Sequence, residues 1–232
     1  MEMWVDAIVW YAAFVFSATL HEAAHAAAAR LGGDPTAYEG GQVSIDPIPH
    51  IRREPFGMVV LPLVSLFVMG WPLGFASAPY DPTWADRHPR RAAWMSLAGP
   101  AANLLLVVLC AGAIWGGVAL GELDSPERAF HAHVVEAVHG GIWGSFAFIV
   151  SVAFTLNLIL FVFNLIPLPP LDGSGALGLL LGEDQARRLR ELTSNPMFAI
   201  AGMMIAWYAF GAIFEPIFLL SLNLLYPGAD YR

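Results

Sequence analysis

The sequence contains no lysine, only one cysteine and few charged residues. Its 11 basic residues are all arginine and face 19 acidic residues, which gives a net charge of −8. Because no basic stripe is present, we do not expect the chain to bind nucleic acid. The single Cys110 excludes an internal disulfide and a metal site built from cysteines.

The shortage of charge accompanies an excess of apolar residues. Hydrophobic residues make up 57% of the chain and charged residues 13%, whereas a soluble domain has about a quarter of its residues charged. Several apolar runs exceed the roughly 18 residues that cross the hydrocarbon core of a membrane. We therefore expect an all-α membrane protein, a polytopic helical bundle of about four to six transmembrane segments, with one domain over residues 1–232. The apolar runs lie at residues 4–29, 56–78, 92–120, 142–166, 175–182 and 197–226.

The arginines predict the topology. Three follow the first apolar run and three follow the second: Arg30, Arg52, Arg53, Arg87, Arg90 and Arg91. Short cytoplasmic loops collect basic residues, so both linkers should face the cytoplasm, and the 56–78 run should then turn back without crossing. Prolines and glycines within that run also make it a poor straight helix. We predict four full spans plus a re-entrant element.

A short strand or β-hairpin is predicted just after the first apolar run. Between Tyr38 and Ile48, Gly40 and Gly41 permit a turn, and Val43 and Ile45 alternate with other residues. A strand at residues 41–46 could pair with an extended peptide.

The first apolar run contains the sequence His21-Glu22-Ala23-Ala24-His25. On a helix, residues four apart share one face, which suits two imidazoles that bind one zinc ion. Glu22 is then placed to accept a proton from the attacking water. The alternative is that both histidines are ordinary buried residues, but ionisable groups in membrane segments are costly and usually functional.

A second group of residues ends the 142–166 run. It reads Asn164-Leu-Ile-Pro167-Leu-Pro-Pro-Leu-Asp172-Gly173, and its prolines must break the helix. Irregular backbone at membrane depth is tolerated only inside the protein or against a cavity. Asp172 is therefore predicted to be the third ligand that a catalytic zinc needs, on the cytoplasmic side with the two histidines. The alternative is an aspartate that caps the next helix.

Together these motifs resemble the site-2 protease family of intramembrane metalloproteases, whose signatures are H-E-x-x-H and, on a later helix, N-x-x-P-x-x-x-L-D-G. The segment Gly99-Pro100-Ala-Ala-Asn103 is similar to the family's G-P-x-x-N. The resemblance covers most of residues 17–182 and points to the compact prokaryotic branch without PDZ or CBS domains. It implies one Zn²⁺ per chain, bound by His21, His25 and Asp172, with Glu22 as the base.

The resemblance also implies residues that hold the substrate. In the family, the asparagine that corresponds to Asn164 and the prolines after it, Pro167 first, help to hold the unwound substrate beside the metal. Asn103 could hydrogen-bond the substrate backbone, and a role in helix–helix packing is an equal alternative. Where many compact relatives have a lysine-containing G-W-A-K-P stretch, residues 74–79 read GFASAP, so no lysine role carries over.

We therefore expect an intramembrane zinc metalloendopeptidase that cleaves single-span membrane proteins in or near their transmembrane segments, as in regulated intramembrane proteolysis. Two alternatives remain open. A zinc-binding membrane transporter would need a polar relay across the bilayer, and a non-catalytic scaffold that binds helices would not need Glu22. The identity of the substrate and the oligomeric state cannot be read from the sequence.

Overall fold

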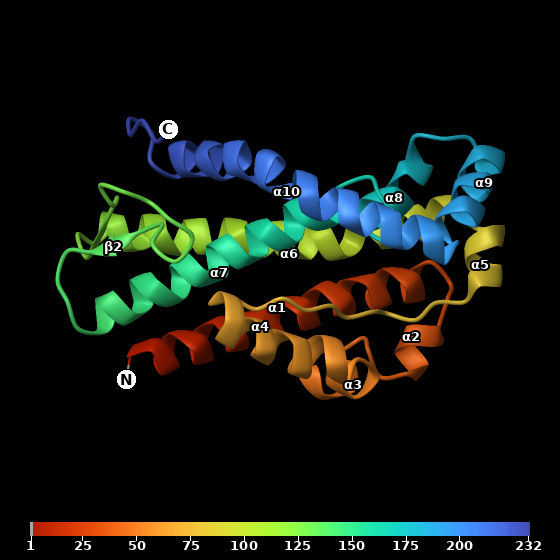
Figure 1. Cartoon of the computed structure of the whole chain (residues 1–232), viewed down its shortest axis with the longest axis horizontal. Coiled ribbons are helices and arrows are strands. Elements are labelled where there is room, and N and C mark those ends of the chain that lie inside the picture. Colours follow the sequence, from red (N-terminus) through yellow and green to blue (C-terminus); the bar gives the residue numbers. More distant parts are fainter. Residues whose placement is uncertain (1) are drawn as a thin grey trace.

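The computed structural model describes residues 2–232. Within these residues four helices are long and apolar enough to cross a membrane, so the prediction of four spans is confirmed. They alternate in direction along the long axis of the molecule (Figure 1). The four are α1 (Glu2–Leu31), α6 (Pro89–Ala119), α7 (Ile142–Asn164) and α10 (Pro196–Leu225).

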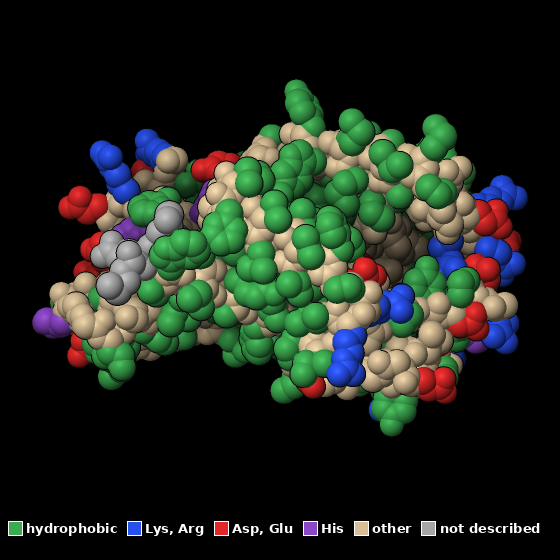
Figure 2. Space-filling model, turned by 60° about the horizontal axis from the view of Figure 1, so that its bottom comes forward, with side chains coloured by type: hydrophobic (Ala, Val, Ile, Leu, Met, Phe, Trp, Pro, Cys, Tyr) green, Lys and Arg blue, Asp and Glu red, His purple; other side chains and the backbone are tan. Residues whose placement is uncertain are grey.

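The surface of the bundle is apolar over its middle. Figure 2 shows hydrophobic side chains over the central part of the visible face and charged side chains chiefly toward the two ends. Large residues of the spanning helices are exposed, among them Leu109 and Tyr208. Apolar surface this extensive is typical of contact with lipid and not with water.

The 56–78 run turns back within the bundle, as predicted. A π-helical turn, η1 (Phe56–Val60), continues into α4 (Leu61–Met69), and the left-handed Gly70 ends that helix at φ 81°. The chain then returns without regular structure beside α1 to α5 (Pro82–Arg87) (Figure 1). This segment therefore enters and leaves at the same end of the bundle.

The prediction of a strand between Tyr38 and Ile48 is wrong. The structure has α2 (Thr36–Glu39), a turn at Gly41 and then α3 (Pro47–Arg53). Asp46 caps α3 by accepting a hydrogen bond from the backbone N–H of Ile48 at 2.9 Å. An aspartate cap followed directly by proline favours the start of a helix, and this local preference outweighs the alternation of Val43 and Ile45.

The remaining elements lie at the two ends of the bundle. A small antiparallel pair, β1 (Leu123–Asp124) and β2 (Glu136–Ala137), joins α6 to α7 at one end. At the opposite end a short series of helices joins α7 to α10: α8 (Asp172–Ala176), η2 (Leu177–Leu179) and α9 (Glu183–Thr193). The apolar run at 175–182 is thus too short to cross the membrane. Between the two ends, α6 packs along both α1 and α7.

Candidate metal centre

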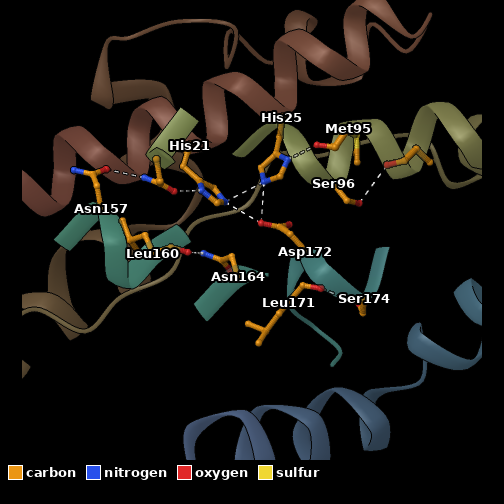
Figure 3. A network of polar contacts seen from close by, with 12 residues as sticks. His21, His25, Met95, Ser96, Asn157, Leu160, Asn164, Leu171, Asp172 and Ser174 are labelled. Carbon is orange, nitrogen blue, oxygen red and sulfur yellow. Dashed lines mark hydrogen bonds and ion pairs between the residues drawn. The ribbon is translucent and has the colours of Figure 1, made fainter. Parts of the chain in front are cut away.

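Three predicted ligands meet in the structure. His21 and His25 lie one turn apart on α1, and Asp172 is the first residue of α8. The Nε2 atoms of the two histidines are 3.0 Å apart, and they lie 3.1 and 3.3 Å from Oδ2 of Asp172. Figure 3 shows the three side chains converging. Among the residues that the structure describes, this is the one group of three or more such side chains close enough to hold a metal ion.

The donor set fits a zinc ion. Ligands about 2.0–2.1 Å from a tetrahedral zinc lie about 3.3 Å from one another, close to the observed separations. Gly99 of α6 leaves the necessary room, since a Cβ atom there would lie 2.3 Å from Nε2 of His25 and 2.5 Å from Nε2 of His21. Three protein ligands also leave one position open, as in catalytic zinc sites.

Both imidazoles are held in place by a hydrogen bond at Nδ1. Nδ1 of His25 donates a hydrogen bond to the backbone carbonyl of Met95 at 2.7 Å, and Nδ1 of His21 lies 2.6 Å from Oδ1 of Asn103. An imidazole with its proton on Nδ1 presents a lone pair at Nε2. Both rings are therefore arranged to bind an ion through the nitrogens that converge.

The loop between α7 and α8 positions Asp172. Gly173 packs directly on this loop, because a Cβ there would lie 2.3 Å from the carbonyl oxygen of Leu165. Ser174 donates to the carbonyl of Leu171 at 2.8 Å and holds the first turn of α8. Oδ2 of Asp172 thus lies beside both Nε2 atoms, where a carboxylate oxygen is available to a metal.

Glu22 lies beside these donors in a cleft. Its side chain is buried, and it lines a cleft of about 360 Å³ together with His25 and Asp172. The non-helical segment Ala76–Tyr80 and residues of α9 form further parts of the wall. Arg190 of α9 pairs with Asp86 of α5 at 3.0 Å and ties these two elements together.

The structure gives Asn103 contacts other than those expected for a substrate-binding residue. It is fully buried, and both ends of its amide bind protein groups, His21 and Asn157. In this structure Asn103 therefore contacts His21 and Asn157 on neighbouring helices, which fits the alternative of a helix–helix packing role, and its contact with a substrate remains a prediction. The physical reason is that α6 approaches α1 closely enough at Gly99 for Asn103 to reach the imidazole.

The other two expected substrate contacts lie outside the cleft. Nδ2 of Asn164 donates to the carbonyl of Leu160, one turn earlier in its own helix, at 3.0 Å. Pro167 is exposed, whereas Pro169 and Pro170 line the cleft. Contact of Asn164 and Pro167 with a substrate remains a prediction.

Sequence reasoning missed two features of the site. The segment lining the cleft is Ala76–Tyr80 and not the expected strand at 41–46; the glycine and proline residues between Gly70 and Pro79 were the available signal for non-helical backbone. Asn157, inside an apolar helix, was also missed, although a polar side chain in a membrane span is itself a signal.

Comparisons with known proteins agree with this geometry. The chain is 35% identical over 159 residues to a Bacillus subtilis protein named "Putative zinc metalloprotease YwhC", covering 68% of this chain and 63% of that protein. It is 31% identical over 199 residues to a Mycobacterium tuberculosis protein named "Putative zinc metalloprotease Rip2", covering 85% of this chain and 66% of the relative. The chain thus spans less than two thirds of the length of these relatives. No solved structure matches it. The model of peptidase family M50 matches residues 9–209, and the chain belongs to that family.

Proposed function

We propose that this protein is a zinc-dependent endopeptidase that cleaves other membrane proteins in or near their transmembrane segments. The observation that carries the proposal is the convergence of His21, His25 and Asp172 beside Glu22, in a cleft at one end of four spanning helices. The donor set would hold one zinc ion per chain, and the relatives carry the name "Putative zinc metalloprotease".

Zinc, when bound, supplies a Lewis acid that polarises a peptide carbonyl and makes water a stronger nucleophile near neutral pH. The protein's own contribution is proton transfer. Glu22 accepts a proton from the attacking water and delivers it to the leaving amine. Ser96 and Ser174 line the same cleft as Glu22 and make part of its wall polar, which suits a cleft that must admit water.

The non-helical segment Ala76–Tyr80 is suited to hold an unwound substrate. The carbonyl of Ser77 accepts a 3.5 Å hydrogen bond from Gln42, whereas the N–H groups of Ala76, Ser77 and Ala78 have no hydrogen-bond partner within residues 2–232. Unpaired backbone beside a cleft can pair with an extended peptide. We propose that the substrate lies between this segment and the metal donors, and that it is a single-span membrane protein.

We propose that the end of the bundle that holds the metal donors faces the cytoplasm, and that the protein lies in a prokaryotic cell membrane. All arginines other than Arg128 and Arg232 lie in linkers or helix ends at the metal end, on α1 to α6 or on α9. An excess of arginine in short loops is the usual mark of the cytoplasmic side.

The test uses the full chain, purified in detergent, with metal analysis and cleavage of model single-span proteins. We expect one zinc per chain and cleavage that stops when a chelator removes the metal. Glu22→Gln should keep the zinc and lower the cleavage rate by about 10²–10⁴-fold, while Glu39→Gln, at an exposed position, should change neither.

Two results would contradict the proposal. Absence of zinc from the wild-type chain would show that the donors do not form a metal centre. Undiminished cleavage by zinc-loaded Glu22→Gln would show that Glu22 is not the base. Zinc binding without any cleavage by the wild-type chain would favour the transporter or scaffold alternative.

A further inference from the structure

A chain of buried hydrogen bonds connects the metal centre to α7. Oδ1 of Asn103 lies 2.6 Å from Nδ1 of His21, and Nδ2 of Asn103 donates to Oδ1 of Asn157 at 2.8 Å. Nδ2 of Asn157 in turn donates to the carbonyl of Ala153 at 2.8 Å and to Oγ of Ser17 at 3.0 Å. Figure 3 shows Asn157 at one end of this series of contacts and His21 at the other. This series of hydrogen bonds thus connects three helices, α7, α6 and α1.

All of these polar groups are removed from solvent. Asn103 is 0% exposed, Asn157 2% and Ser17 1%. Burying an amide costs free energy unless its hydrogen bonds are made, and polar residues in membrane spans are usually retained for function. Packing alone is therefore a poor reason for two asparagines at these positions.

The direction of the hydrogen bonds is determined at the α7 end. A backbone carbonyl can only accept, so the Ala153 carbonyl requires the NH₂ group of Asn157 to face it. The oxygen of Asn157 then faces Asn103, which must answer with its own NH₂ group. The remaining oxygen of Asn103 faces His21 and requires a proton on Nδ1. Nε2 of His21 is left with its lone pair directed at the other donors.

His25 reaches the same state by a shorter route. Its Nδ1 donates directly to the Met95 carbonyl, another group that can only accept. Each histidine is therefore oriented by a backbone carbonyl, directly for His25 and through two asparagine amides for His21. The longer route can fail by rotation of an amide, which the direct contact cannot.

We infer that Asn157 is a positioning residue for the metal centre, because it holds the Asn103 amide in the one orientation that leaves Nε2 of His21 free to bind an ion. The inference rests on the proposed metal site. Without the Asn157 oxygen, the Asn103 amide can turn over and present its NH₂ group to Nδ1. The imidazole proton must then move to Nε2, where it blocks a metal ligand.

The test is zinc affinity, measured by competition with a chromophoric chelator on the purified full chain. Asn157→Leu should weaken zinc binding by about 10–100-fold, the usual effect of losing a residue that orients a metal-bound histidine. Thr155→Val is the matched control, since Thr155 is on the same helix, is 0% exposed, and has a hydroxyl without a hydrogen-bond partner among the described residues. This control should bind zinc as the wild type does.

A second substitution separates orientation from general damage. In the double variant Asn157→Leu/Asn103→Asp, both carboxylate oxygens at position 103 accept, so the group has no wrong orientation toward Nδ1 of His21. We expect this double variant to recover most of the zinc affinity that Asn157→Leu loses. Asn157→Ala, which removes the same amide with a smaller side chain, serves as the test should Asn157→Leu fail to fold.

Two results would overturn the inference. Equal zinc affinity in the wild type and Asn157→Leu would show that the orientation does not depend on Asn157. No recovery of zinc affinity in the double variant would show that amide orientation is not the cause. Absence of zinc from the wild type is a separate result, because it removes the proposed metal site and this inference together.

Discussion

The two halves of α6 differ in what they require of their neighbours. Near the metal centre, Gly99 lets the helix backbone approach within contact distance of two imidazoles. In the other half, Gly112 and Gly116 have open space where a Cβ would lie, and Ile114 belongs to the apolar cluster formed with α7 and α10. The half near the metal thus depends on the absence of a side chain beside the histidines. The other half is packed with apolar side chains, among them Leu123, which fills the space beside Gly117.

The difference shows how one helix can serve chemistry and packing together. In the metal half, close backbone approach brings Asn103 and the Met95 carbonyl to the histidines. In the half farther from the metal centre, α6 contributes Val107 and Ile114 to a cluster of apolar side chains. We expect a substitution by alanine to abolish zinc binding in the half near the metal, and to lower the stability of the fold without loss of zinc in the other half.

The largest effect is expected for Gly99→Ala. The added methyl would occupy the space between the two Nε2 atoms, so zinc should be lost and cleavage should fall by at least about 10²-fold, as expected when reacting groups are misplaced. Gly112→Ala on the same helix, with no atom within 4 Å of its Cβ, should keep both. Zinc per chain and cleavage rate are the measurements. A zinc-loaded, active Gly99→Ala would remove the contrast between the two halves.

Ile114→Ala should instead weaken the fold and spare the chemistry. Ile114 is 0% exposed, and removing a buried aliphatic side chain costs about 2–5 kcal/mol through lost contacts and a cavity. The free energy of unfolding in detergent should fall by this amount, with unchanged zinc per folded chain. Leu105→Ala, at an exposed position of the same helix, should have little effect. Loss of zinc from folded Ile114→Ala would show that the two halves are coupled.

A smaller effect is expected where α10 meets the loop that leads to Asp172. A Cβ at Gly202 would lie 2.0 Å from the carbonyl oxygen of Pro169, and overpacking of this kind costs about 1–3 kcal/mol. Gly202→Ala should lower the unfolding temperature, whereas Gly211→Ala, with free space around it on the same helix, should not. Equal unfolding temperatures for the two variants would show that the backbone at Pro169 can move away from a methyl group at position 202 without loss of stability.

The smallest effect is expected at the end farthest from the metal donors. His139 is 75% exposed and lies 3.6 Å from Glu122, and exposed ion pairs contribute about 0–1 kcal/mol. His139→Gln should therefore leave stability, zinc content and cleavage close to those of the wild type. A fall in zinc per chain would instead indicate a second metal site among the histidines of that loop.

Much of the fold follows from local patterns. The length and hydropathy of the four long runs predict the spanning helices, and the prolines and glycines after Pro62 predict the turn back at Gly70. The strand at Tyr38–Ile48 failed because two signals competed locally, and the Asp46 cap with Pro47 prevailed. Hydropathy could not decide between them, since either conformation would place the same apolar residues in a short connecting segment.

The sequence by itself determined the composition of the membrane bundle and the pairing of His21 with His25, because helical periodicity places residues four apart on one face. Only the tertiary structure decided which groups surround that pair. Asp172 lies 151 residues after His21 in the chain, Asn103 contacts His21 from α6, and Asn157 of α7 hydrogen-bonds Asn103. These contacts depend on the rotation and register of whole helices against one another, which no local pattern in the chain specifies.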